Sequence, residues 1–257
     1  MELCMLLFMG LRYRVFSTGF SSLIVYFLVQ TLASFSILVC YTFSYFRFFL
    51  FFVLLKLSMF PFHSWFLSVV YSFPSFPLFL VSSFHKLPSF LLVALFSCSR
   101  VTNALFLSCL ISLVLSGRFM LSTADLRFLL LSSSIGNNSW FVLSCLHSSL
   151  LLVAFLCVYS FFLYLVLGFL GSLSSLKATV KGPASLMIFT TYVMALSGLP
   201  PFPVFWFKLA LVFLCSSLLS SFFMFLFLLA AMLVLRGYVK FCLDLLTIRS
   251  SFYFWAG

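Results

Sequence analysis

Acidic residues are nearly absent from this chain. Only three of its 257 residues carry a carboxylate side chain, and charged residues of either sign make up 7% of the sequence, whereas 65% is hydrophobic. A water-soluble domain needs many more polar and charged side chains than this to cover its surface. The scarcity of charge therefore excludes a water-soluble enzyme and indicates a membrane protein. The three acids are Glu2, Asp125 and Asp244.

The sequence also lacks the patterns that bind metals and redox cofactors. Its eight cysteines stand singly, with no CxxC pair, and its three histidines, His63, His85 and His147, have no ligand spacing to them. Neither a metal site nor a disulfide framework is expected from such a pattern. There is no GxGxxG motif to bind a dinucleotide. We therefore expect no cofactor in this chain: no NADH, flavin or iron–sulfur cluster.

Apolar runs are what the sequence has in abundance. Whole twenty-residue windows are apolar, as bilayer-spanning helices require, whereas barrel strands alternate apolar and polar residues. We predict an all-α polytopic membrane protein, a single transmembrane helical domain over 1–257 with about nine helices. A Pro-rich connection is expected over 61–77, and "GLPPFP" interrupts the eighth segment. The predicted segments are 1–11, 20–45, 47–60, 77–98, 102–116, 126–146, 148–170, 183–218 and 219–240.

The basic residues predict the orientation. With this set of helices, nine basic residues fall in the loops of one side and two in the loops of the other, which is the asymmetry of the positive-inside rule. The C-terminus is then expected on the inner side. The inner loops contain Arg12, Arg14, Arg118, Arg127, Lys177, Lys181, Arg236, Lys240 and Arg249, and the outer loops contain Arg47 and Arg100.

Three lysines, Lys56, Lys86 and Lys208, remain inside the apolar segments. A lysine at mid-bilayer costs about 2.5–3.5 kcal/mol on insertion scales, so such residues mark functional sites. Each lies beside a helix breaker: Pro61 follows the first, Pro88 follows the second, and "LPPFP" precedes the third. Backbone groups freed at membrane depth are tolerated only against protein or a water-filled cavity. The pattern indicates a hydrated path along which lysines exchange protons.

Simpler interpretations stay open at this point. Lys208 can extend to the interface beside Trp206, and Lys56 lies close to the inner end of its helix. His85 adjoins Lys86 and is a candidate to continue the relay, although adjacent helix positions do not face one another. His63, in "PFHSW", is a secondary candidate. Asp125 and Arg127 look like a solvated helix start.

Five segments in order resemble the antiporter-like subunits of respiratory complex I, and among these NADH dehydrogenase subunit 2. "KLSMFPFHSW" resembles the KxxxPFHxW signature, and "VYFLVQTLAS" resembles the YFLxQxxxS segment of subunit 2. "FHKLPS" is similar to its QKxxP, "TADLRFLLLSSSIGNNSW" to its TQLRKxLAYSSIxxxGW, and "SGLPPFPVFWFK" to its GGLPPxxGFxxK. Together they cover most of the chain from 25 to 208.

The resemblance implies a fold with two discontinuous helices, here breaking near Pro61 and at Leu199, Pro200 and Pro201. It also implies a proton relay in which a Glu–Lys pair is followed by a central Lys and a Lys on the second broken helix. Those positions match Lys56, Lys86 and Lys208. Glu2 is the candidate for the glutamate, although another register places Arg12 there. His85 replaces the usual Gln, Phe128 replaces a Lys, and the chain is shorter than the family at both ends.

The expected function is that of a compact proton-translocating subunit of mitochondrial NADH:ubiquinone oxidoreductase. Its partners would be the other membrane-arm subunits, neighbouring antiporter-like subunits among them, and membrane lipids, with no nucleic acid. The expected location is the mitochondrial inner membrane, with the C-terminus and basic loops on the matrix side. Two alternatives remain: a cation/proton antiporter subunit of the same superfamily, and a structural subunit that no longer pumps, which the shortened termini favour.

Overall fold

The computed structural model describes residues 20–43, 45–95, 99–123, 125–172, 183–216 and 220–255. All regular secondary structure in these ranges is helical. The elements are α2 (Phe20–Thr42), α3 (Phe46–Leu57), α4 (His63–Val70), α5 (Ser75–Ser82), the 3₁₀ turn η1 (Phe84–Lys86), α6 (Leu87–Leu95), α7 (Ser99–Ser122), α8 (Leu126–His147), α9 (Ser149–Ser172), α10 (Pro183–Ser197), α11 (Pro203–Cys215) and α12 (Ser221–Trp255).

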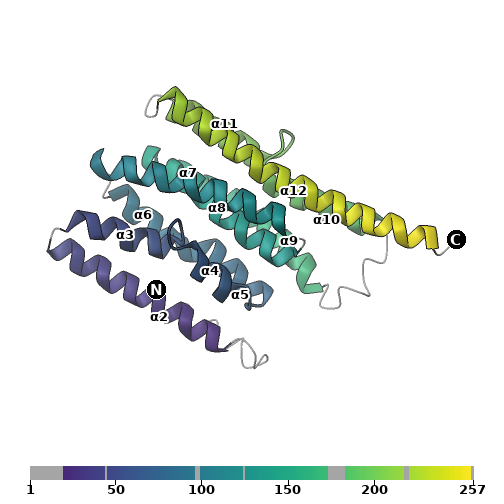
Figure 1. Cartoon of the computed structure of the whole chain (residues 1–257), viewed down its shortest axis with the longest axis horizontal. Helices are drawn as coiled ribbons and strands as arrows, with labels where there is room; N and C mark the ends of the chain where they lie inside the picture. The colour runs from purple at the N-terminus through teal and green to yellow at the C-terminus, as the bar shows by residue number, and fades with distance from the viewer. Residues whose placement is uncertain are drawn as a thin grey trace.

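The helices lie side by side in a bundle with α8 near its centre. Figure 1 shows α2 along one side and α12 along the opposite side, with α7, α8 and α9 between them. Among the described residues, five segments are long and apolar enough to cross a membrane, and shorter apolar helices cover 48–57, 187–197 and 203–215. The prediction of an all-α polytopic membrane protein is therefore confirmed.

Helix α8 is the exception in composition. It contains five serines and two asparagines over 132–144 and is not among the apolar spans, yet every residue from Leu129 to Cys145 is buried. Polar side chains at membrane depth must face other protein groups or a cavity, and a central helix meets that condition on all sides. The bundle therefore surrounds a polar helix with apolar ones.

Glycine brings α7, α8 and α12 close together. A Cβ at Gly237 of α12 would lie 2.6 Å from the Met120 Cβ on α7, and one at Gly136 of α8 would lie 2.5 Å from Ser116 Oγ. Small residues at contact points are the usual way in which membrane helices approach closely. These contacts fix α8 against its neighbours and so position the polar groups that it carries.

The end of α3 is a helix break within the bundle. Ser58 takes the left-handed conformation, with φ 55°, and its N–H donates to Leu55 O while the N–H of Met59 donates to Leu54 O. This is the hydrogen-bond pattern of a Schellman cap, which satisfies two of the four free carbonyls at a helix end. The carbonyls of Lys56 and Leu57 remain for other partners.

Four predicted segments differ from the structure, and the first is the helix predicted over 77–98, which is divided into α5, η1 and α6. The expected connection over 61–77 contains helix α4, because the chain resumes helical structure two residues after Pro61. The predicted segment 102–116 is the longer α7, and 219–240 is the still longer α12. Both helices continue past their apolar runs into residues that the hydropathy pattern alone assigns to loops, since backbone hydrogen bonding does not stop at the membrane surface.

Candidate functional site

The side chain of Lys86 is buried at the centre of the site. It ends the 3₁₀ turn η1, which separates α5 from α6, and only 4% of its surface is exposed. This turn replaces one turn of α-helix just before Pro88 and directs the lysine toward α8. There its Nζ donates a hydrogen bond of 3.0 Å to Asn138 Oδ1.

Asn138 connects this lysine to the first helix break. Its Nδ2 donates a hydrogen bond of 2.8 Å to the carbonyl of Leu57, the last residue of α3. Because Oδ1 accepts from Lys86, the orientation of the amide is fixed by both partners. The last carbonyls of a helix carry the negative end of its dipole, which favours a nearby cation. The buried lysine is thus electrostatically coupled to the broken end of α3.

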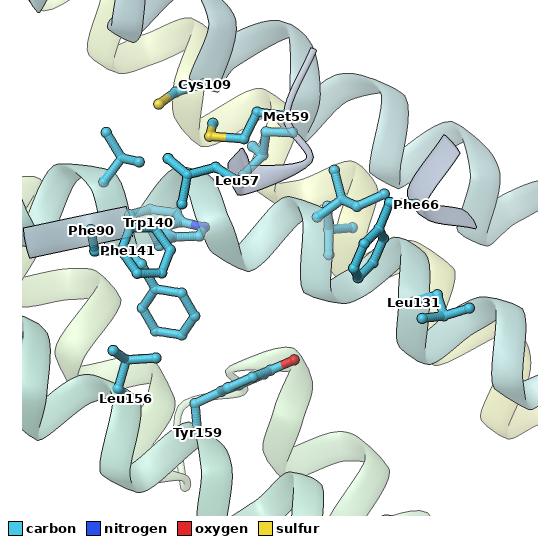
Figure 2. Close-up of a cluster of buried hydrophobic side chains, with 14 of the residues drawn as sticks. Leu57, Met59, Phe66, Phe90, Cys109, Leu131, Trp140, Phe141, Leu156 and Tyr159 are labelled. Atoms are coloured by element: carbon cyan, nitrogen blue, oxygen red, sulfur yellow. The ribbon is translucent and has the colours of Figure 1, made fainter. Parts of the chain in front are cut away.

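The surroundings of this amine are apolar. Lys86 Nζ lies 4.8 Å from the centre of the Phe66 ring of α4, within cation–π distance. Figure 2 shows Phe66 and Leu57 in the cluster of buried side chains around α8. Among the described residues Asn138 Oδ1 is the polar acceptor of this amine, which otherwise lies in an apolar site where a charge is costly to bury.

Lys208 lies at the second helix break. It belongs to α11, and its Nζ donates a hydrogen bond of 3.1 Å to the carbonyl of Ser197, the last residue of α10. The chain between the two helices turns at Gly198, which has φ 82°, and continues through "LPPF". Lys208 Nζ also lies 5.9 Å from the Trp140 ring of α8. The side chain therefore turns toward the break rather than toward the interface, where Trp206 is 62% exposed.

The two lysines lie on different sides of α8. Asn138, which binds Lys86, and Trp140, which faces Lys208, are two positions apart. Successive residues of an α-helix are about 100° apart around its axis, so these two positions point about 200° apart. Helix α8 therefore stands between Lys86 and Lys208.

His85 and Lys86 point to different neighbours. The hydroxyl of Tyr26, on α2, lies 3.1 Å from His85 Nδ1 in a hydrogen bond whose donor depends on the tautomer of the histidine. The Tyr26 ring also packs edge-on against the imidazole. The polar contact of His85 is therefore with α2, and that of Lys86 is with α8.

Lys56 lies on the last turn of α3 and is half-buried. Its carbonyl accepts a hydrogen bond of 3.4 Å from Gln30 Nε2 of α2. The last two carbonyls of α3 are thus each bound by a side-chain amide, one from Gln30 and one from Asn138. The predicted partner, Glu2, lies outside the described residues, and so does Arg12.

The remaining predicted residues lie in or near the breaks. Pro61 lies between α3 and α4, Pro88 is the second residue of α6, and Leu199, Pro200 and Pro201 lie between α10 and α11. His63 begins α4, and its ring packs against Phe119 of α7. Its Nδ1 has no hydrogen-bond partner in the described part of the chain. Within the described ranges, no hydrogen bond or ring contact joins His63 to the lysines.

Sequence reasoning assigned no role to Asn138, Gln30 or Tyr26. Asn138 lies in "SIGNNSW", where two consecutive amides interrupt an otherwise apolar and hydroxyl-bearing helix. Amide side chains are costly in a membrane helix unless they have hydrogen-bond partners. Their presence in such a helix can therefore identify them as candidate site residues. For Gln30 and Tyr26 the only signal is their spacing of four, which places both on one face of α2.

Comparisons with known proteins show the fold. No family model matches the sequence, and no curated protein matches it. Thirty-nine chains of solved structures match the fold. One belongs to a structure described as respiratory complex I from Thermus thermophilus with bound aureothin, with a TM-score of 0.74 and 22% identity. The match covers 87% of this chain and 58% of that chain. This protein therefore has the fold of part of that complex I chain and spans just over half of that chain's length.

Proposed function

We propose that this chain is a proton-translocating membrane-arm subunit of respiratory complex I, equivalent to subunit 2 of its antiporter-like family. It carries out no redox chemistry itself and needs no cofactor. Quinone reduction elsewhere in the complex drives it. Its partners are the other membrane-arm subunits and lipids, and its location is the mitochondrial inner membrane, with the C-terminus on the matrix side.

One observation carries this proposal: Lys86 and Lys208 are each connected to the carbonyl at the broken end of a helix. Lys208 binds Ser197 O directly, and Lys86 binds Leu57 O through Asn138. A cation inside an apolar bundle at membrane depth is expensive to keep without a role. Residues at a helix break also move when the break moves, which gives a way to couple conformation to protonation.

Each of these residues has a separate proposed role in proton transfer. A change in the pairing of Lys56, for which Glu2 is the proposed partner, alters the field at the end of α3. Asn138 transmits that change to Lys86, because its amide binds both Leu57 and the lysine. Lys86 then gives up its proton and becomes a neutral amine, and that proton passes toward a neutral Lys208, which takes it up and releases it toward one face of the membrane. His85 is the proposed continuation toward Tyr26.

Membership of the complex is tested by isolation from native membranes. An affinity tag is placed at the C-terminus, the membranes are solubilised in a mild detergent, and the eluate is assayed for NADH-dependent quinone reduction. Co-elution of that activity with the tagged chain is the expected result. Elution without it, together with sodium- or potassium-dependent proton exchange in vesicles, would instead identify the chain as a free-standing antiporter subunit.

A further inference from the structure

Gln30 and Trp65 each have a buried polar atom without a partner. Gln30 of α2 is 3% exposed, and within the described ranges its Oε1 accepts no hydrogen bond. The indole Nε1 of Trp65, in the first turn of α4, is also buried and has no acceptor there. A buried polar atom left without a partner costs about 1–3 kcal/mol. One of the two atoms is an acceptor and the other is a donor, so each offers what the other lacks.

The two residues lie at nearly the same level on facing helices. Gln30 binds the carbonyl of Lys56, and Ser72 Oγ donates a hydrogen bond of 2.7 Å to Ser22 Oγ. Residue numbers therefore rise from α3 to the end of α4 while they fall along α2, which Figure 1 shows beside both helices. Trp65 is seven residues before Ser72, about 10 Å, and Gln30 is eight residues after Ser22, about 12 Å. Trp65 thus stands opposite Gln30.

Tyr26 shows that the indole packs on the same face of α2. The centre of its ring lies 5.9 Å from that of Trp65. Tyr26 is also one turn before Gln30, so both residues lie on one face of α2. The indole therefore packs against the helix face to which the unpartnered amide oxygen belongs.

The other end of the Gln30 amide is bound to the helix break. Its Nε2 donates to Lys56 O at 3.4 Å, longer than the about 2.7–3.2 Å of an ordinary N–H···O bond. This contact fixes the orientation of the amide, because the reverse orientation would place two oxygens against each other. An amide that accepts a hydrogen bond at its oxygen donates more strongly at its nitrogen. A donor at Oε1 would therefore draw Gln30 and the Lys56 carbonyl together.

The segment between α3 and α4 can move without loss of helical hydrogen bonds. Ser58 ends α3 in the left-handed conformation, and α4 begins at His63. Trp65 lies next to this break, whereas Ser72, beyond the far end of α4, is bound to α2. A change of direction at the break therefore moves Trp65 relative to α2 more than it moves Ser72.

We propose that Trp65 Nε1 donates a hydrogen bond to Gln30 Oε1 in a second position of the break, and that this bond positions Lys56. In the position described here the two atoms are not bonded. When the indole binds Oε1, Nε2 tightens on the Lys56 carbonyl, and the last turn of α3 moves toward α2 together with its lysine. Gln30 and Trp65 are positioning residues, and neither of them exchanges a proton. This inference rests on the proposed function, since it supplies the movement by which the pairing of Lys56 changes.

Two maps of the assembled complex test the bond directly. One map is determined without substrate, and the other during turnover with NADH and quinone. The distance from Trp65 Nε1 to Gln30 Oε1 should be within about 3.2 Å in one map and clearly longer in the other. The same distance in both maps, or a water molecule between the two atoms in both, would overturn the inference.

A double-mutant cycle tests whether the two residues act together. Gln30→Met keeps the length of the side chain without its amide, and Trp65→Phe removes the indole N–H. Each should slow proton translocation about tenfold, the factor for one hydrogen bond, and the double variant should be no slower than Gln30→Met alone. A loss of about a hundredfold in the double variant would mean separate structural roles and would overturn the inference. Trp206→Phe, at a 62% exposed indole of α11, is the matched control and should change nothing.

Failure of this inference and failure of the proposed function give different results. Loss of translocation in Lys86→Ala, together with independent losses in the cycle, would refute the positioning role and leave the proposed function standing. Unchanged translocation in Lys86→Ala would refute the relay, while the two maps would still decide whether the bond forms. The maps of the unmodified complex also decide it if a variant at position 30 or 65 does not assemble.

Discussion

The amine of Lys208 donates a hydrogen bond of 3.1 Å to the carbonyl oxygen of Ser197, across the break between α10 and α11. Lys86 stands in a similar relation to Leu57 at the end of α3, with Asn138 placed between them. The last carbonyl of a helix that stops inside the bundle accepts directly from Lys208 in the first case and from the Asn138 amide in the second. A helix break therefore leaves a carbonyl that a lysine can satisfy, either directly or through an amide that also binds the lysine.

Gly198→Ala should displace Lys208. Residue 198 has φ 82°, where a side chain costs about 1–2 kcal/mol, and an added Cβ would lie 3.2 Å from Lys208 Nζ. We expect a lower melting temperature together with slower proton translocation. Gly168→Ala is the control, because a Cβ there has no neighbour within 4 Å. Equal behaviour of the two variants would show that Lys208 does not depend on the geometry of this turn.

Asn138→Asp should lower proton translocation, with some loss of stability because a carboxylate cannot donate to the Leu57 carbonyl. An amide accepts a hydrogen bond from the lysine whether or not the amine is charged, whereas a carboxylate favours the ammonium and holds its proton. Asn138→Leu removes both hydrogen bonds and should cost about 1–3 kcal/mol for the unsatisfied groups that it leaves. Asn103→Asp, at an exposed position of α7, is the control. If Asn138→Asp translocates protons at the normal rate, Asn138 does not control Lys86.

Gly237→Ala should loosen the contact between α12 and α7. Its new Cβ would lie 2.6 Å from the Met120 Cβ, a distance at which one helix must shift. Overpacking of this kind costs about 1–3 kcal/mol. The melting temperature in detergent measures the loss, with Gly168→Ala again as the control. A melting temperature equal to that of the control would mean that the two helices separate at little cost.

The fold could be predicted because its main signals are local. Long apolar runs mark the spans, and "GLPPFP" marks the break that ends α10 at Ser197. Helix α4 could not be predicted from hydropathy, because Pro61, Pro74 and Pro77 suggest an irregular connection. The helix forms between those prolines, where every N–H is available, and buries Phe66 and Val70 against the bundle.

The site could be predicted in part, because a lysine in an apolar segment is conspicuous in sequence. Its partners could not be predicted in the same way. Asn138 is 52 residues from Lys86 and 81 from Leu57, so only packing of α8 against the break brings them together. The 3₁₀ turn that separates the directions of His85 and Lys86 also depends on tertiary contacts, since an uninterrupted helix is what the apolar pattern favours.

The central claim is that Lys86 carries protons, and Lys86→Ala in the assembled complex tests it most directly. The measurement is the number of protons moved per NADH oxidised in sealed vesicles, with Lys240→Ala, at an exposed lysine of α12, as the control. Removing a group that transfers a proton slows that transfer by about 100-fold or more. We predict that Lys86→Ala loses this chain's share of the protons, while Lys240→Ala retains it. An unchanged number of protons per NADH in Lys86→Ala would contradict the account.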